Sequence, residues 1–254
     1  MLLAVDIGNT NIVLGCIEEN NIIFRERIYT NQLATDLEYA ANLKTAMDMH
    51  DIKPESISGA IISSVVPTMT ATFSAAVRKL IGVKPKVVGP GLKTGLSIVI
   101  DNPAQLGSDL VVDAVAGINE YTAPMIIIDM GTATTLSVVD DKKRYLGGMI
   151  VTGMAVSSDA LIKRTAQLPK FAFEKPKHVI GTNTVDCLKS GLMYSTACAL
   201  DGMIERIEEE LGQECTVIAT GGLASTVVPL CRKTIILDDD LLLKGLNLIY
   251  NKNI

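Results

Sequence analysis

A short pattern that occurs twice constrains this chain more than any other feature of its sequence. Residues 6–11 read D-I-G-N-T-N and residues 129–134 read D-M-G-T-A-T, so an aspartate, an apolar residue and a glycine recur in the same order. Each hexamer ends an apolar run, at 2–7 and 125–130, and precedes further runs that are typical of strands. A glycine turn between two strands is ordinary hairpin chemistry, so one hexamer alone indicates little. Its recurrence in the same context favours a duplicated unit over coincidence.

The segments around the hexamers support two similar halves. In the first half we expect strands at 11–17, 22–28, 59–65 and 86–88, and helices at 35–50, 68–80 and 110–119. In the second half we expect strands at 135–139, 145–150 and 216–219, and helices at 153–166, 184–211 and 241–250. These halves predict domains at 1–120 and 121–254. The expected fold class is α/β, with mixed sheets flanked by helices.

The composition fits a layered core and argues against several classes of partner. Of the 254 residues, 48% are hydrophobic and only 4% aromatic, so aliphatic side chains must fill the interior. The net charge is −5 without a long basic run, which disfavours nucleic acid as a partner. No apolar stretch has the ~20 residues of a membrane helix, and the N-terminus does not resemble a signal peptide. We therefore expect a cytoplasmic protein without a membrane partner. The five scattered cysteines lack any C-x-x-C pair and are expected as reduced core thiols.

The hexamers have the chemistry of a nucleotide phosphate site. Glycine lets backbone N–H groups approach an anion closely, and threonine and asparagine side chains add neutral hydrogen bonds. An aspartate repels phosphate, but it becomes useful when Mg²⁺ lies between the carboxylate and the phosphate oxygens. The chain has no G-x-x-x-x-G-K-[ST], and no G-x-G-x-x-G follows its first strand, so neither a P-loop nor a dinucleotide-binding fold is indicated. We expect two facing turns that enclose the β- and γ-phosphates of ATP in a cleft between the halves.

Several motifs in a fixed order carry a resemblance to a known family. The two hexamers, with T-G-G-L-A at 220–224, resemble the two phosphate motifs and the adenosine motif of the acetate-and-sugar-kinase/actin superfamily. Further segments come in the order found in type III pantothenate kinases: S-S-V-V-P at 63–67, V-G-P-G at 88–91, D-N-P at 101–103, G-S-D at 107–109, G-G at 147–148 and G-T-N-T at 181–184. The similarity extends from residue 1 to about residue 250. It implies duplicated actin-like (ribonuclease H-like) half-domains.

The resemblance also implies an activity and a set of site residues. The activity is ATP-dependent phosphorylation of pantothenate to 4′-phosphopantothenate, the first step of coenzyme A biosynthesis. Asp6 would serve Mg²⁺, and Asp129 would coordinate a monovalent cation, potassium or ammonium. The residues implied for ATP are Asp6, Ile7, Gly8, Asn9, Thr10, Asn11, Ile12, Val13, Thr132, Gly221 and Gly222. Those implied for the substrate are Gly107, Ser108, Asp109, Leu110 and Thr184, in a pocket completed across a homodimer interface.

The resemblance assigns the chemistry to Asp109, as the general base that takes the proton from the primary hydroxyl of pantothenate. In a loose transition state, positioning and charge neutralisation contribute more than base strength. The residues by themselves leave another role open, because serine and aspartate before an apolar run are common N-caps. In that interpretation Asp109 caps the helix 110–119 and Thr184 caps the helix 184–211, while Thr132 and Thr134 reflect strand propensity alone. Asp113, one turn further on, is expected to be a solvated helix residue.

Two departures from the family pattern matter, both in the acceptor pocket. The family commonly has G-A-D-R where this chain has G-S-D-L, so Leu110 replaces an arginine that could pair with the substrate carboxylate. It also commonly has a tyrosine before D-N-P, where this chain has Ile100. ATP handling is expected to persist because the phosphate motifs are intact. The alternatives are a kinase for another small hydroxylated acid, and a non-catalytic nucleotide-binding regulatory protein.

Overall fold

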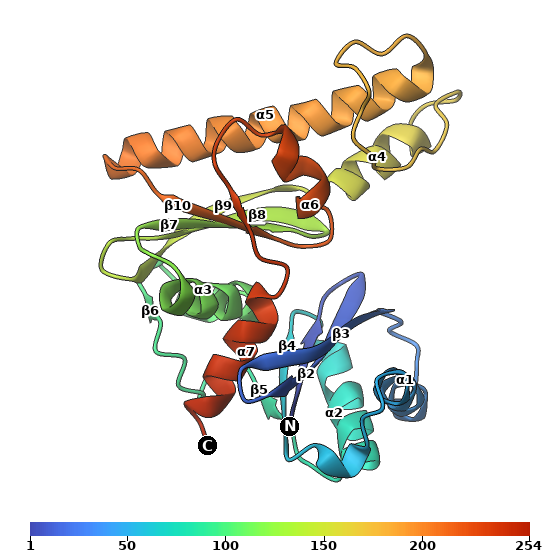
Figure 1. Cartoon of the computed structure of the whole chain (residues 1–254), viewed down its shortest axis with the longest axis vertical. Helices are drawn as coiled ribbons and strands as arrows, with labels where there is room; N and C mark the ends of the chain where they lie inside the picture. Colours follow the sequence, from blue (N-terminus) through green and yellow to red (C-terminus); the bar gives the residue numbers. More distant parts are fainter. The chain divides into compact units, whose positions relative to one another are not determined.

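The computed structural model describes residues 1–254 and divides them into two compact units (Figure 1). Unit 1 comprises Met1–Leu96, Asp101–Asn119 and Asp240–Ile254, and unit 2 comprises Ser97–Ile100 and Glu120–Asp239. The C-terminal segment therefore packs with the first part of the chain. The predicted domain boundary between residues 120 and 121 separates the two sequence repeats, and it stays a prediction.

A five-stranded mixed sheet forms the centre of unit 1, in the order β3-β2-β1-β4-β5. β1 is antiparallel to β2, which is antiparallel to β3. β1 is parallel to β4, which is parallel to β5. The tight turn after β1 produces the first antiparallel pair, whereas the parallel partners are reached through helical crossovers. The strand bounds are β1 Leu2–Ile7, β2 Asn11–Glu18, β3 Asn21–Tyr29, β4 Gly59–Ser64 and β5 Lys86–Val87.

Helices cover both faces of the unit 1 sheet. Leu3 and Val5 of β1 are fully buried in an apolar cluster with α1 and α2. α7 lies against the other face, where Gly59 has no side chain and Tyr250 occupies the space that a Cβ would fill. α3 packs closely on α7. The helix bounds are α1 Asp36–Met49, α2 Pro67–Ile81, α3 Ser108–Glu120 and α7 Leu241–Asn251, with short 3₁₀ turns η1 Pro54–Ser56 and η2 Pro103–Gln105.

The six-stranded sheet of unit 2 repeats the topology of the first sheet. Its order is β11-β10-β7-β8-β9-β6. β7 is antiparallel to β8 and parallel to β10, as β1 is to β2 and β4. β8 is antiparallel to β9, and β10 is parallel to β11, so five strands correspond one to one. This correspondence supports the expected duplication. The bounds are β6 Ser97–Ile98, β7 Met125–Met130, β8 Ala133–Val139, β9 Arg144–Thr152, β10 Thr216–Thr220 and β11 Ile236–Leu237.

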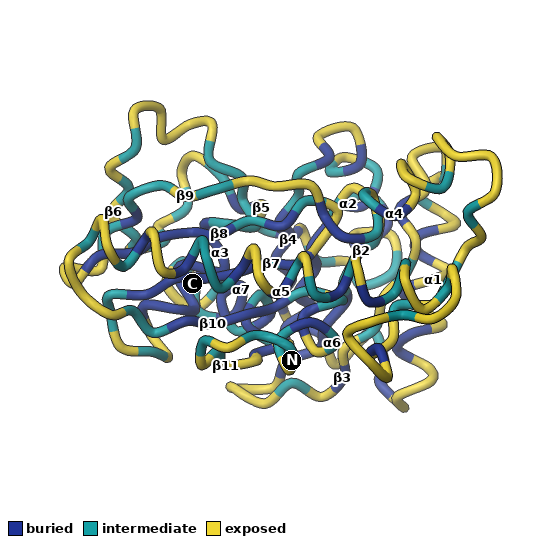
Figure 2. Tube along the Cα trace, turned by 90° about the horizontal axis from the view of Figure 1, so that it is seen from above, coloured by how far each residue is buried: buried dark blue, intermediate teal, exposed yellow.

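A long helix covers the core face of the unit 2 sheet. Ile126 and Ile128 of β7 are buried in one cluster with Leu200 and Ile204 of α5. Figure 2 shows buried positions concentrated on the strands and exposed positions mainly on loops and outer helix faces. The helix bounds are α4 Met154–Lys163, α5 Thr184–Leu211 and α6 Ala224–Val227, with the 3₁₀ turn η3 Val228–Leu230. None of the helices of the chain has both the length and the apolar character needed to cross a membrane.

The expected elements are confirmed, with differences mainly at their ends. β1, β7 and α5 have the predicted bounds, whereas α3 begins two residues earlier than expected and α4 ends at Lys163 instead of 166. The sequence does not predict β6, β11 or α6, because elements this short have no periodicity to recognise. The expectation of core thiols is wrong for Cys187 and Cys198, which lie exposed on α5.

Candidate active site

The first hexamer forms a closed turn at one edge of the unit 1 sheet. Asp6 is the penultimate residue of β1 and is only 8% exposed, and it pairs in register with Ser63 of β4. The N–H of Gly8 donates to the carbonyl of Asn11 at 3.0 Å, which closes the turn. The Thr30 hydroxyl donates to the Gly8 carbonyl at 2.7 Å. The turn is therefore also held by Thr30, the residue that follows β3. The sequence gives no sign of this supporting role, because a single threonine after a strand is ordinary.

Two of the three hydrophobic residues beside this turn, Ile7 and Ile12, point away from the face that carries Asp6. Ile7 and Ile12 are fully buried in the cluster with α1 and α2. Val13 lies on the alternate face of β2 and is half-buried. If Ile7 and Ile12 contact a nucleotide, they do so through backbone groups. Asn9 and Thr10, at the tip of the turn, have exposed side chains.

The G-S-D-L segment starts α3 in the same unit and reaches the same sheet edge. The Ser108 hydroxyl lies 3.0 Å from the Ser63 hydroxyl, and it hydrogen-bonds the backbone N–H and carbonyl of Ser64 at 3.0 Å each. Ser63 is the register partner of Asp6. The start of α3 therefore lies at the end of β1, so Asp6 and Asp109 lie at the same edge of the sheet.

The carboxylate of Asp109 is largely enclosed. Its Oδ1 accepts a hydrogen bond from the Leu110 N–H at 2.8 Å. A Cβ on Gly107 would lie 2.4 Å from the same oxygen, so only glycine leaves room for this arrangement. Burial raises the pKa of Asp109 above its ordinary value, and the nearby backbone N–H groups of Leu110 and Asp109 offset this only in part. A desolvated carboxylate is a better proton acceptor than a hydrated one, which suits a general base.

The helix-capping alternatives are wrong for both candidate residues. α3 begins at Ser108, so Asp109 lies inside its first turn instead of preceding the helix. The carbonyl of Gly107 accepts from the Val111 N–H, as expected for the residue before the first turn. At α5 the cap is Asn183, whose side chain accepts from the Asp186 N–H at 2.9 Å. Thr184 follows that cap and is exposed, so its side chain remains available to a ligand.

The expectation that Asp113 is solvated is wrong. It is 1% exposed, and its neighbours along α3 from Val111 to Ile118 are buried as well. The sequence did contain a signal, because a helix that is apolar on all sides is a buried helix. Asp113 is thus a second buried carboxylate on the helix that begins with Asp109.

The second hexamer repeats this arrangement in unit 2. Asp129 is the penultimate residue of β7, and its register partners are Thr135 of β8 and Thr220 of β10. The N–H of Gly131 donates to the carbonyl of Ala133 at 3.0 Å and closes the turn, in which Thr132 is exposed. Each aspartate thus lies near the end of the corresponding strand, β1 or β7, on the sheet face opposite the buried cluster.

The T-G-G segment lies directly against Asp129. Gly221 has φ +96°, a conformation that L side chains rarely adopt. A Cβ at Gly221 would lie 2.6 Å from both Asp129 Oδ1 and the Met130 backbone nitrogen. Only glycine permits this approach. The structure therefore brings the proposed adenosine motif and the second phosphate motif together, with Gly222 exposed beside them.

The surroundings of the two aspartates fit cations of different kinds. The buried Thr135 hydroxyl has no hydrogen-bond partner, and paired residues in antiparallel strands place their side chains on one face. A hydroxyl oxygen beside the Asp129 carboxylate is suited to a monovalent cation. The chain has no group of three or more His, Cys, Asp or Glu side chains that could hold a metal ion. A divalent ion at Asp6 would complete its coordination with phosphate oxygens and water, the usual mode of Mg²⁺.

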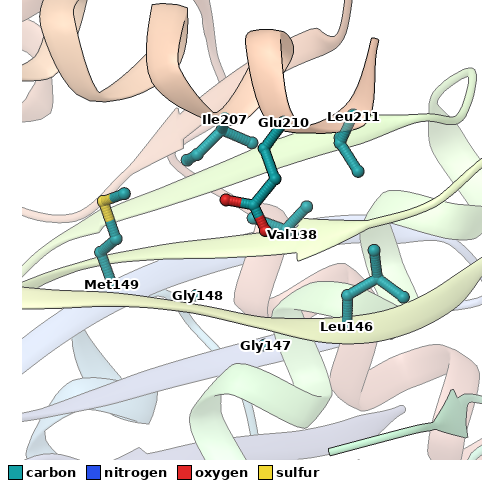
Figure 3. A pocket seen from close by; sticks show the side chains of 8 residues that line it. All are labelled: Val138, Leu146, Gly147, Gly148, Met149, Ile207, Glu210 and Leu211. Carbon is teal, nitrogen blue, oxygen red and sulfur yellow. The ribbon is translucent and has the colours of Figure 1, made fainter. Parts of the chain in front are cut away.

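A hollow of about 160 Å³ in unit 2 lies away from these residues. Figure 3 shows Glu210 pointing from α5 toward Val138 of β8, with Leu146 and Met149 of β9 alongside. Val138 pairs with Ile126 near the start of β7, whereas Asp129 is near its end. At ~3.3 Å per residue along a strand, the hollow is about 10 Å from the Asp129 position. We therefore do not include it in the candidate site.

A comparison with known protein families identifies the chain. The model of the type III pantothenate kinase family matches residues 2–206. This chain belongs to the type III pantothenate kinase family. Curated type III pantothenate kinases are similar over the full length: that of Halalkalibacterium halodurans is 41% identical, covering 100% of both chains. Those of Exiguobacterium sp. and Bacillus cytotoxicus are 43% and 41% identical, covering all of this chain and 99% and 97% of theirs.

Solved structures share the fold of this type III pantothenate kinase family member at low sequence identity. A Campylobacter jejuni protein described as a Baf family transcriptional activator has TM-score 0.62 and 16% identity, with 99% of this chain and 98% of that one covered. A Sinorhizobium meliloti protein described as a 2-dehydro-3-deoxygalactonokinase has TM-score 0.60 and 13% identity, with 99% and 96% covered. These likenesses confirm the expected fold class. That the two hexamers face each other across a cleft stays a prediction.

Proposed function

We propose that this chain transfers the γ-phosphoryl group of ATP to the primary hydroxyl of pantothenate and releases ADP and 4′-phosphopantothenate. Membership of the type III pantothenate kinase family over the full chain supports this reaction. The structural observation that carries it is the meeting of the Asp6 turn and the Asp109 helix at one sheet edge, through the Ser63–Ser108 contact of 3.0 Å. A phosphate-binding turn beside an enclosed carboxylate is what phosphoryl transfer to an alcohol requires.

Asp109 acts as the general base in this proposal. The hydroxyl oxygen of the acceptor attacks the γ-phosphorus while the bond from that phosphorus to the β–γ bridging oxygen breaks. The hydroxyl proton passes to the Asp109 carboxylate and later to solvent, and ADP leaves with the bridging oxygen. Because burial raises the pKa of Asp109, the carboxylate accepts the proton more readily than a solvated aspartate would.

The glycine turns position the nucleotide. The backbone N–H groups and the exposed Asn9 and Thr10 side chains of the first turn would bind phosphate oxygens, and Thr132 would do so from the second turn. Gly221 and Gly222 would lie along the adenosine. Asp6 would hold Mg²⁺, and Asp129 with the Thr135 hydroxyl would hold potassium or ammonium. When bound, such cations would neutralise charge that develops on the phosphate oxygens.

We propose that the enzyme is a homodimer in which Thr184 contributes to a shared acceptor pocket. Large apolar side chains are exposed in the segment just before Thr184, where Val179 is 64% and Ile180 81% exposed, and Ile150 of β9 in the same unit is 75% exposed. Figure 1 shows α4 beside the first half of α5, at the end where Thr184 lies. Light scattering of Ile180→Asp should give a monomer. Leu33→Asp, a matched change at a 92% exposed leucine of unit 1, should remain a dimer, and a dimeric Ile180→Asp would contradict the assignment.

An ADP-release assay with pantothenate, Mg²⁺ and potassium tests the reaction. Removal of a positioned general base lowers turnover by about 10²–10⁴-fold, which we expect for Asp109→Asn. Asp141→Asn, a change of the same kind at an exposed aspartate in the turn between β8 and β9, should retain turnover. The absence of turnover by the wild type would reject pantothenate as acceptor. Parallel assays with other hydroxylated acids then test whether Leu110, in place of the usual arginine, has changed the acceptor.

A further inference from the structure

We propose that the buried hydroxyl pair Ser63–Ser108 is a positioning device that sets the place of Asp109 relative to the Asp6 turn. This inference rests on the proposed phosphoryl transfer, and it gives a role to two side chains that no other part of the site explains. Ser108 was expected to contact the substrate, but its hydroxyl points to β4 and is engaged there. Ser63 is 0% exposed and cannot reach a ligand.

The hydrogen bonds of Ser108 use the full capacity of its hydroxyl. A serine hydroxyl donates one proton and accepts two. The Ser108 oxygen accepts from the Ser64 N–H and donates to the Ser64 carbonyl, each at 3.0 Å. Its one proton is then used, so Ser63 is the donor in the contact of 3.0 Å between the two hydroxyls. An alanine at position 108 would lose all three bonds.

These bonds replace a missing strand partner. β5 pairs only with Ile61 and Ile62 of β4, so it ends before Ser64. The first residue of α3 occupies the backbone groups of Ser64 instead, and this fixes the helix start against the sheet. Asp109 is the next residue, and its Oδ1 is held by the Leu110 N–H with no room for a side chain at Gly107. The carboxylate thus has little freedom once Ser108 is bound.

The same sheet end offers a matched control. The Thr70 hydroxyl of α2 donates to the Ser64 hydroxyl at 3.0 Å, and this bond also ties a helix to the end of β4. α2 carries none of the proposed site residues. Thr70→Val therefore removes a comparable hydrogen bond at the same place without acting on the helix that carries Asp109.

The test compares kcat, the KM for ATP and the pH profile of both variants with the wild type, using the pantothenate assay. The family commonly has alanine at the position of Ser108, so the device is particular to this chain. A displacement of about 1 Å at a reacting group can reduce turnover 10²-fold, so Ser108→Ala should lower kcat by about 10- to 100-fold. The KM for ATP should stay within about twofold, since the Asp6 turn is held independently by Thr30. The acidic limb of kcat should move to lower pH, because a loosened helix start admits water to Asp109. Thr70→Val should change none of these.

A second pair of variants keeps the test decisive if Ser108→Ala folds poorly. Ser63→Ala leaves the two bonds from Ser108 to the Ser64 backbone and removes only the hydroxyl contact, so kcat should fall in the same direction but less. Ser108→Thr keeps the hydroxyl and should recover part of the loss. Equal kcat values and pH limbs for Ser108→Ala and Thr70→Val would overturn the positioning role while the wild type still turned over. An inactive wild type would instead reject the proposed function.

Discussion

Replacing Gly221 by alanine tests two separate reasons for glycine in the T-G-G segment, namely the close packing against β7 and the positive φ. At φ +96° a residue with a Cβ is strained by roughly 1–2 kcal/mol. The added methyl would also lie 2.6 Å from both Asp129 Oδ1 and the Met130 backbone nitrogen. Overpacking of this kind costs about 1–3 kcal/mol, because the backbone atom can move only with its strand. We expect a total loss of about 2–5 kcal/mol.

Gly212→Ala is the matched control for this prediction. Gly212 also has a positive φ, +68°, but no atom lies within 4 Å of the position of a Cβ. It should show only the conformational cost of roughly 1–2 kcal/mol. In a chain of this size 1 kcal/mol shifts Tm by about 2–4 °C. The extra ~1–3 kcal/mol from overpacking at Gly221 should therefore lower Tm by about 2–12 °C more than the control does.

Thermal denaturation followed by circular dichroism gives the Tm of both variants, and steady-state kinetics gives their KM for ATP. Gly221→Ala should also raise the KM for ATP, because any movement of the segment displaces Asp129, whereas Gly212→Ala should not. Equal Tm values for the two variants would refute the packing reasoning. A large loss of Tm with an unchanged KM for ATP would refute the assignment of this segment to the nucleotide.

Three further changes test other features of the molecule. Burial raises the pKa of Asp109 in the folded state, so ionisation of this carboxyl group opposes folding at pH values above the ordinary carboxyl pKa. Asp109→Asn should therefore raise Tm at pH 7. This gain in Tm should disappear near about pH 4, where the carboxyl group becomes protonated in the unfolded chain. A Tm of Asp109→Asn below that of the wild type at pH 7 would contradict the conclusion that the Asp109 charge is buried. Thr35 and Glu38 form a capping box at the start of α1, so Thr35→Ala should cost about 1 kcal/mol of unfolding free energy in urea, whereas Thr35→Ser should not. Burial raises the pKa of Cys231 to about 12, so iodoacetamide at pH 8 should label it far more slowly than the exposed Cys187, and equal rates by mass spectrometry would refute this.

The sequence predicts the strands that carry the aspartates because their pattern is local. An apolar run that ends in aspartate and glycine identifies β1 and β7 without reference to any other part of the chain. The recurrence of that pattern then predicts the duplicated topology, which the matching strand orders support. The role of Asp109 as a site residue follows only from the family resemblance, since the residues alone favour a helix cap.

Long-range contacts could not be predicted from the sequence. Ser63 and Ser108 are separated by 45 residues, and nothing in the local pattern of either serine indicates that the other is its partner. Gly221 approaches Asp129 because β10 lies beside β7, a neighbour relationship that periodicity does not encode. Asp113 differs from its expectation for another reason: the apolar residues on every side of it bury it despite its charge.

The return of the chain to unit 1 at Asp240 has a consequence for biosynthesis. Unit 2 is almost continuous in sequence, so most of its contacts are available before residues 240–254 leave the ribosome. The sheet that contains β1 must wait for α7, which is translated after unit 2 and covers one of its faces. A nascent chain that stops short of Asp240 would thus carry a finished second half and an N-terminal sheet with an uncovered apolar side, the form that a chaperone or protease would meet.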